Sequence, residues 1–140
     1  MAERGLLLDT HVWIWAAEGL ERQLSRRAIR AIEHARAAGQ IYVSAVSVRE
    51  VVLLAERGRL TLSMPADAWA RRALAVSGVH ALVLDPEAAA LSARLPPSAP
   101  RDPADQMLIA TAMLYGLTLV TRDEAILKYG SEAGMVVMSA

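Results

Sequence analysis

Four carboxylates occupy positions from which they could share one site. Asp9 directly follows a short apolar run and Asp123 comes shortly after another, while Glu50 and Asp105 lie near the starts of two predicted helices. Two carboxylates about 4 Å apart repel by about 4 kcal/mol in a partly buried site, so a cluster of four needs a cation or raised pKa values. Mg²⁺ and Mn²⁺, which prefer oxygen ligands and suit phosphate substrates, are the natural counter-ions.

Each of these acids also has a local structural explanation. Asp9 can cap a helix that begins at Thr10. Glu50 lies three residues after Ser47, in the pattern of a capping box, where serine and glutamate satisfy the first free helix amides. Both interpretations compete with a role in a shared site.

The remaining acids follow the same pattern. Asp102 can cap a helix with Pro103 in its first position and Asp105 in its first turn, and Thr121 can cap the segment that contains Asp123. Asp85, which also precedes a proline, shows that this chain uses such starts for architecture alone. The local explanations do not account for four acids at one predicted edge of a sheet.

The composition excludes several other chemistries. The 140 residues include no cysteine, which excludes disulfides, a thiolate nucleophile and sulfur-bound zinc. His11, His34 and His80 are too scattered to predict a metal site. The 15 basic and 15 acidic side chains give a net charge of zero, which disfavours indiscriminate binding of nucleic acid. No stretch is typical of a membrane span or targeting signal, so we expect a cytoplasmic protein without membrane contact.

Predicted strands and helices alternate along the chain. Apolar runs predict strands at Gly5–Asp9, Ile41–Val43, Val79–Leu84, Thr118–Val120 and Met135–Met138. Caps, helical spacing and terminal glycines or prolines predict helices between Ser25 and Gly39, at Val48–Arg57, around Ala66–Val76, from Pro86, and at Pro103–Tyr115. This alternation predicts one three-layer α/β domain over residues 1–140, with a mainly parallel central sheet flanked by helices. Functional residues gather beyond the carboxyl ends of such strands.

Four segments, in this order, carry a family resemblance. They are Leu6–His11, Val43–Glu50 with the later Gly58–Leu60, Arg101–Ala110 and Leu117–Asp123. On these segments the chain resembles the PIN-domain ribonucleases, specifically the VapC-type toxins of bacterial and archaeal toxin–antitoxin pairs. The segments span nearly the whole chain, and their correct order and spacing make the resemblance specific.

The resemblance implies a PIN-like fold and a set of site residues. It assigns metal-binding carboxylates to Asp9, Glu50, Asp105 and Asp123, and it gives the Thr121 hydroxyl the role of positioning water or the last carboxylate. Catalysis would be hydrolysis of RNA phosphodiester bonds, in which one or two Mg²⁺ or Mn²⁺ ions activate water and neutralise charge on the leaving oxygen.

The resemblance also implies partners. These are an RNA substrate, a second copy of the chain in a homodimer, and a cognate antitoxin whose tail covers the site. Apolar residues either form a groove for that tail or belong to the core, and the core is the better interpretation for most of them: Trp13, Ile14, Trp15, Val52 and Leu53.

Arginines are available to hold the RNA, because Lys128 is the single lysine among the 15 basic residues. The candidates are Arg26, Arg30, Arg49 and Arg122, with Arg22 and Arg27 nearby, although a solvated helix face is the favoured explanation for each of them taken singly. Two of the family's usual residues are replaced. Arg49 stands where an aromatic residue is common, and Gln106 stands where arginine often follows the aspartate. Neither change removes a carboxylate, so both concern the choice of substrate or partner.

Two other functions remain open. A catalytically silent PIN-like module would bind RNA or protein without cleaving, although it has no need of all four acids. A phosphatase with Asp9 as covalent nucleophile would need a second aspartate two residues later, where the chain has His11.

Overall fold

Five parallel strands form the centre of the molecule. The computed structural model describes residues 4–140. The strands lie in the order β3-β2-β1-β4-β5, and each neighbouring pair is parallel. Their bounds are Leu6–Leu8 (β1), Ile41–Ser44 (β2), Val79–Leu82 (β3), Thr118–Thr121 (β4) and Val137–Ser139 (β5). The order reverses between β1 and β4, which makes their carboxyl ends the switch point where α/β proteins bind ligands.

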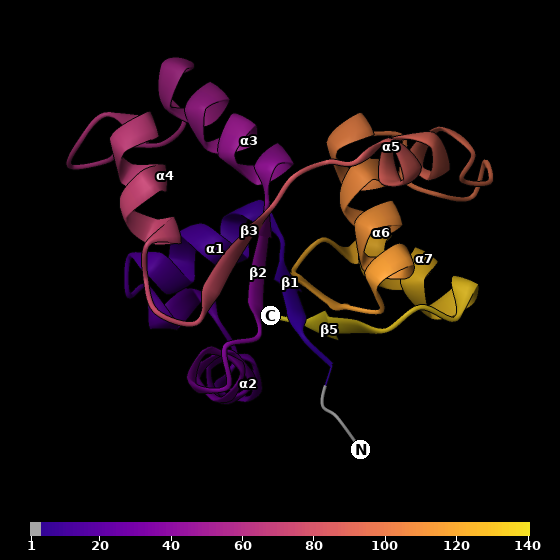
Figure 1. Cartoon of the computed structure of the whole chain (residues 1–140), viewed down its shortest axis with the longest axis horizontal. Coiled ribbons are helices and arrows are strands. Elements are labelled where there is room, and N and C mark those ends of the chain that lie inside the picture. Colours follow the sequence, from indigo (N-terminus) through magenta and orange to yellow (C-terminus); the bar gives the residue numbers. More distant parts are fainter. Residues whose placement is uncertain (1–3) are drawn as a thin grey trace.

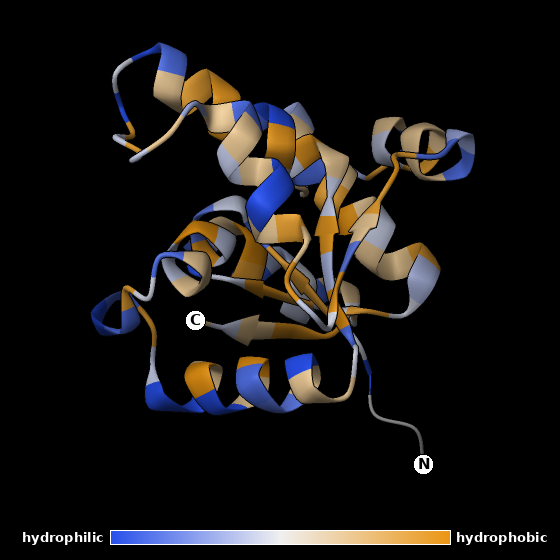
Figure 2. Ribbon diagram, turned by 60° about the vertical axis from the view of Figure 1, so that its left-hand side comes forward, coloured by the Kyte–Doolittle hydropathy of each residue, from blue (hydrophilic) through white to orange (hydrophobic). Residues whose placement is uncertain are grey.

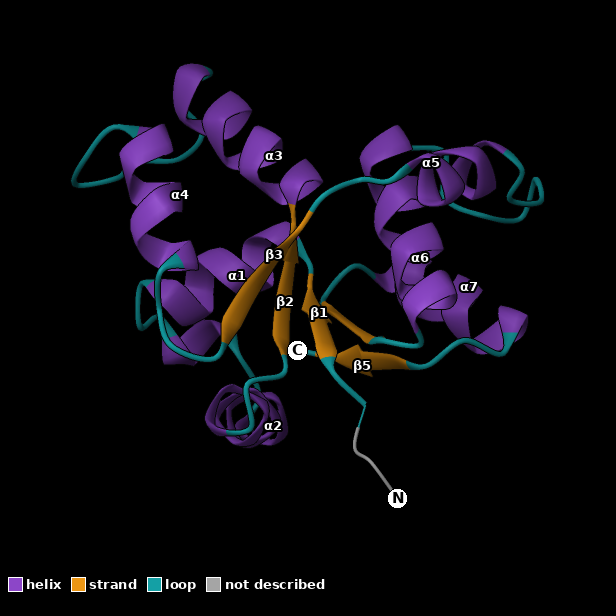
Figure 3. Ribbon diagram, viewed as in Figure 1, coloured by secondary structure: helices purple, strands orange, loops and turns teal. Residues whose placement is uncertain are grey.

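Helices cover both faces of this sheet, as Figures 1 and 3 show. Helices α1 to α4 lie on one side of the sheet and α5 to α7 on the other. Between residues 4 and 140 no helix is long and apolar enough to cross a membrane. The helix bounds are Thr10–Ala17 (α1), Arg26–Ala37 (α2), Ala45–Glu56 (α3), Ala66–Leu74 (α4), Pro86–Ala93 (α5), Pro103–Tyr115 (α6) and Glu124–Ala133 (α7), with a 3₁₀ turn η1 at Glu21–Gln23.

The strand β1 separates two hydrophobic cores. Successive side chains of a strand point to opposite faces, so Leu6 and Leu8 pack with α1 to α4, whereas Leu7 packs with α6 and α7. All three side chains are buried, which explains why this strand is uniformly apolar rather than alternating. In Figure 2 the strands are predominantly hydrophobic, whereas α2 carries hydrophilic residues along its length. The predicted three-layer fold with a parallel sheet is confirmed.

The predicted elements differ from the observed ones mainly at their ends. Strand β3 stops at Leu82, and β5 begins at Val137 because the left-handed Gly134 ends α7 and the Met135 amide then bonds to the Gly130 carbonyl. The predicted caps at Ser25 and Asp85 are confirmed, since each side chain accepts a hydrogen bond from the amide three residues later.

The largest difference concerns α3, which begins at Ala45 rather than Val48. The N-cap is Ser44, whose hydroxyl accepts a hydrogen bond from the Val46 amide. The capping box predicted for Ser47 and Glu50 is therefore wrong. Ser47 lies inside the helix and is fully buried, which leaves Glu50 without a capping role.

One glycine fixes the turn that leads into β3. Gly78 has a φ of +88°, in the left-handed region, and a Cβ at this position would collide with the backbone carbonyl of Arg36 at the end of α2. Its own carbonyl accepts a hydrogen bond from the Ile41 amide in β2. The turn therefore holds α2 and the edge of the sheet together.

We predict that Gly78→Ala lowers the free energy of unfolding by about 2–4 kcal/mol, from left-handed strain plus overpacking. Gly19 is the matched control, because its φ is +68° but no atom lies within 4 Å of the position that a Cβ would take. Gly19→Ala should cost only the strain, about 1 kcal/mol. Urea unfolding of both variants measures the difference, and equal losses would contradict the packing role of Gly78.

Candidate active site

The register of the central strands brings Asp9 beside Thr121. Leu8 is aligned with Val120 in β4, and the Asp9 amide continues the ladder by donating to the Val120 carbonyl at 3.0 Å. The Thr121 hydroxyl then donates to Asp9 Oδ2 at 2.7 Å. Thr121 is fully buried, so this bond fixes the carboxylate where β1 ends.

Asp9 and Asp123 each cap the helix that follows them. Asp9 Oδ1 accepts from the Thr10 amide at 2.8 Å, so the predicted cap is confirmed while its other oxygen binds Thr121. Asp123 Oδ1 accepts from the amides of Ala125 and Ile126 at the start of α7. The prediction that Thr121 caps this helix is wrong, because Thr121 ends β4 and its hydroxyl instead accepts from the Asp123 amide.

The four predicted acids line one open cleft of about 410 Å³. Asp9 and Asp123 reach it from the ends of β1 and β4, Glu50 from the second turn of α3, and Asp105 from the first turn of α6. Asp102 lines the same cleft and also caps α6, since its Oδ1 accepts from the Ala104 amide at 2.8 Å. The other lining residues are Thr10, His11, Val12, Trp15, Ala104, Leu108 and Arg122.

Asp105 is the acid whose pKa responds most clearly to burial and to the crowding of carboxylates in the cleft. Burial is the main cause that raises the pKa of its carboxyl group from 3.8 to about 7, and the charges of Asp102, Asp9, Asp123 and Glu50, in that order, act in the same direction. Because desolvation and like charge act together, a proton or a cation stabilises this carboxylate at neutral pH.

The donor set fits a hard divalent cation. Oxygen atoms of carboxylates are the preferred ligands of Mg²⁺ and Mn²⁺, and a cation would relieve the repulsion that acts on Asp105. As the side chains stand, no three Asp, Glu or His residues among residues 4–140 are arranged so that they could hold a metal ion. The cleft therefore brings the acids together without arranging three of them as metal ligands.

Of the predicted basic residues, Arg122 is the one that lies at the cleft. Its guanidinium lies 5.4 Å from the ring centroid of Trp15 and donates to the backbone and side-chain oxygens of Gln23. Arg49 lies on α3, and Arg26 and Arg30 lie exposed on α2, outside the lining of the cleft. That any of these four arginines binds RNA stays a prediction.

Two polar features of this region had no clear signal in the sequence. The Gln106 side chain donates to the Pro100 carbonyl at 2.9 Å, which fastens the loop before α6. Thr10 and Ser47 form a buried hydrogen bond of 2.9 Å between α1 and α3. If Ser44 is taken as the N-cap of α3, Ser47 falls inside the helix, where its side chain is free to bond to another element.

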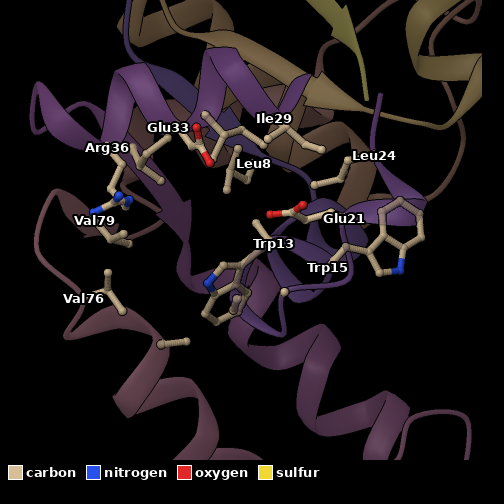
Figure 4. Close-up of a pocket in the computed structure, with 16 residues that line it drawn as sticks. Leu8, Trp13, Trp15, Glu21, Leu24, Ile29, Glu33, Arg36, Val76 and Val79 are labelled. Atoms are coloured by element: carbon tan, nitrogen blue, oxygen red, sulfur yellow. The ribbon is translucent and has the colours of Figure 1, made fainter. Parts of the chain in front are cut away.

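A second cavity, of about 220 Å³, lies on the side of the sheet covered by α1, α2 and α4. Figure 4 shows Leu8, Trp13, Ile29 and Val79 among its lining residues. Trp15 lines both this cavity and the acidic cleft.

The apolar residues predicted for an antitoxin groove or for the core lie in different parts of the fold. Trp13 and Ile14 are buried in the core, whereas Val52 lines an open groove of about 630 Å³ between α3 and α4. Trp15 is half-buried, as one wall of the acidic cleft.

Comparison with known proteins gives the chain a family. The family model described as the PIN domain matches residues 6–132. A curated relative, "Ribonuclease VapC22" of Mycobacterium tuberculosis, is 40% identical over 119 residues, which cover 84% of this chain and 86% of the relative.

Solved structures share the fold. VapBC2 from Rickettsia felis, bound to a DNA fragment from its promoter, matches with a TM-score of 0.69 and 12% identity over 96% of this chain and 97% of that one. FitAcB from Neisseria gonorrhoeae matches with a TM-score of 0.64 and 25% identity over 95% and 96%. Sequence, fold and relatives agree, and the chain belongs to the PIN-domain family, among its VapC-type members.

Proposed function

We propose that the protein is a metal-dependent ribonuclease that acts as the toxin of a toxin–antitoxin pair. The observation that carries this proposal is the meeting of five carboxylates in one cleft at the switch point between β1 and β4, with the pKa of Asp105 raised to about 7. Such a site binds a cation before it binds a phosphodiester. The 40% identity to a ribonuclease supports RNA as the substrate.

Each acid has a separate role in this proposal. Asp9, Glu50, Asp105 and Asp123 would hold Mg²⁺ or Mn²⁺, which when bound supplies Lewis acidity toward the phosphodiester and water. Thr121 orients Asp9 by donating to its Oδ2, and Asp105 holds a proton near neutral pH that it must release before it acts as a ligand. The chain contains no cysteine, and no covalent nucleophile is needed.

Arg122 is the residue we assign to the substrate phosphate. It lies at the rim of the cleft and is exposed, and its contacts with Trp15 and Gln23 hold the guanidinium in place. A guanidinium that is already ordered loses less freedom when it binds a phosphate group.

The proposal includes two protein partners. Neighbours that share the fold are VapBC complexes, which supports a cognate antitoxin for this chain. A cytoplasmic protein of this kind needs such an inhibitor, because free activity would destroy cellular RNA. We also infer a homodimer, supported by three consecutive exposed apolar side chains at the end of α6, Met113, Leu114 and Tyr115, which a second copy would cover.

The first experiment is RNA cleavage with Mn²⁺ or Mg²⁺. We expect EDTA to abolish cleavage and Asp9→Asn or Asp105→Asn to lower its rate by at least about 100-fold, because each removes a charged ligand. Thr121→Val should cost about 10–100-fold, as expected for loss of a group that orients a ligand.

Asp85→Asn is the matched control, since Asp85 caps α5 away from the cleft and asparagine caps a helix equally well. It should cleave like the parent. Cleavage that resists chelation would refute metal dependence. A parent that binds RNA but never cuts it would support the silent module instead.

A second prediction concerns stability and pH without metal. The folded-state pKa of Asp105 lies near 7, above its ordinary 3.8, so the folded state binds the proton more tightly and stability falls as pH rises from about 4 to about 7. Asp105→Asn removes this loss. In EDTA, its advantage in unfolding free energy over the parent should grow from pH 5 to pH 7 and then level off.

Asp67→Asn serves as the comparison, because Asp67 is exposed on α4 and pairs with Arg71. Its difference from the parent should not follow the Asp105 profile. An Asp105→Asn difference that is constant with pH would show that this carboxylate does not titrate as described.

A third prediction concerns the toxin role. Expression of the parent chain should arrest growth, and expression of Asp9→Asn should not, because that variant lacks one of the charged ligands of the proposed metal site. Co-expression of the product of the neighbouring reading frame should restore growth, and that product should co-purify with the chain. A nuclease that causes no arrest at matched expression would separate the enzymatic proposal from the toxin proposal.

A further inference from the structure

A buried hydrogen bond joins α1, which begins directly after Asp9, to α3, which carries Glu50. The Thr10 hydroxyl at the start of α1 donates to Ser47 Oγ in the first turn of α3 at 2.9 Å. Ser47 is 0% exposed and Thr10 is 5% exposed, so solvent does not compete for this bond.

Thr10 and Ser47 each lie within three residues of an acid that lines the cleft. Thr10 follows Asp9, and its amide donates to Asp9 Oδ1. Ser47 precedes Glu50 by three residues, which places both on the same face of α3. The pair therefore connects the end of β1 to the helix that supplies Glu50.

The bond also extends a chain of hydrogen bonds that runs through the site. The Asp123 amide donates to the Thr121 hydroxyl, which donates to Asp9 Oδ2, while Asp9 Oδ1 accepts from Thr10. Thr10 then donates to Ser47. Three separate parts of the fold, the β4–α7 corner, the β1–α1 corner and α3, are held by this one series.

Apolar side chains could fill the space of Thr10 and Ser47 without the free-energy cost of removing two hydroxyls from water. Val51, one turn further along α3, and Val12 in α1 are both fully buried. Burying two hydroxyls removes them from water, and their mutual bond returns little net stability, so the gain from such a pair is a defined geometry.

We propose that Thr10 and Ser47 are positioning residues whose hydrogen bond sets the separation between the carboxylates of Asp9 and Glu50. This inference rests on the proposed cation site. Without the bond α3 still packs against α1, but Glu50 no longer has one fixed place relative to Asp9. The loss should appear as weaker binding of the cation before it appears as loss of the fold.

The experiment measures Mn²⁺ binding by calorimetry for Thr10→Val, Ser47→Ala and the double variant. Each single substitution should weaken Mn²⁺ affinity by about 10-fold, the low end for groups that orient a ligand. The double variant should lose no more than either single one, because both remove the same bond. Thr10→Ser keeps the hydroxyl and should retain the affinity of the parent.

Ser92→Ala is the matched control for a buried serine. The Ser92 hydroxyl donates to the Ala89 carbonyl within α5, and Ser92 does not line the cleft. This variant should retain Mn²⁺ affinity whatever its stability in denaturant. If it weakens Mn²⁺ binding as much as Ser47→Ala does, or if Ser47→Ala binds like the parent, the positioning role is refuted.

A measurement without metal keeps this proposal separate from the proposed function. In EDTA, hydrogen exchange in the first two turns of α3 should rise in Thr10→Val and Ser47→Ala and not in Ser92→Ala. A parent that binds no Mn²⁺ refutes the metal-dependent function alone, and faster exchange in α3 would still support the tether between α1 and α3. Unchanged exchange would overturn the tether whatever the parent binds.

Discussion

The site depends on the parallel pairing of β1 with β4, since that pairing places the end of each strand beside the other. Leu8 is level with Val120, so the next residue of each strand, Asp9 and Thr121, must meet at the carboxyl edge. The pairing of β1 with β2 brings Ser44 to the same edge, and α3 starts there. The acids are gathered by backbone hydrogen bonds and not by any attraction among themselves.

Because the backbone gathers the acids, a protein with no net charge can have a strongly acidic cleft. The 15 acidic and 15 basic side chains cancel over the whole chain, yet five acids share one cleft whose rim carries Arg122. The free energy of packing the sheet and helices outweighs the repulsion that this causes. Asp105 is the most affected acid, because burial and four like charges act on the same carboxyl group. Net charge is therefore a poor guide to the local field that a substrate meets.

The order of the strands and helices was predictable from the sequence, because apolar runs and helix starts are local features. The acids of the cleft were predictable for the same reason, since strand ends of a parallel sheet share an edge. Local signals failed where two hydroxyl residues compete for one cap. Ser44 and Ser47 both precede apolar helical residues, and only the length of β2 decides that Ser44 is the cap. The placement of Arg122 at the cleft, and of Arg26 away from it, depends on the packing of distant elements.

Three of the acids in the cleft also cap helices, and this governs how the site can be lost in evolution. Asp9, Asp102 and Asp123 each accept backbone amides at the start of α1, α6 and α7. Most replacements there damage a helix as well as the site, whereas asparagine or serine retains the cap and removes the carboxylate. Glu50 and Asp105 lie inside their helices and are not N-caps. A lineage that discards the activity and keeps the fold therefore has many routes through Glu50 or Asp105, and only a few, those to another capping residue, through each capping aspartate.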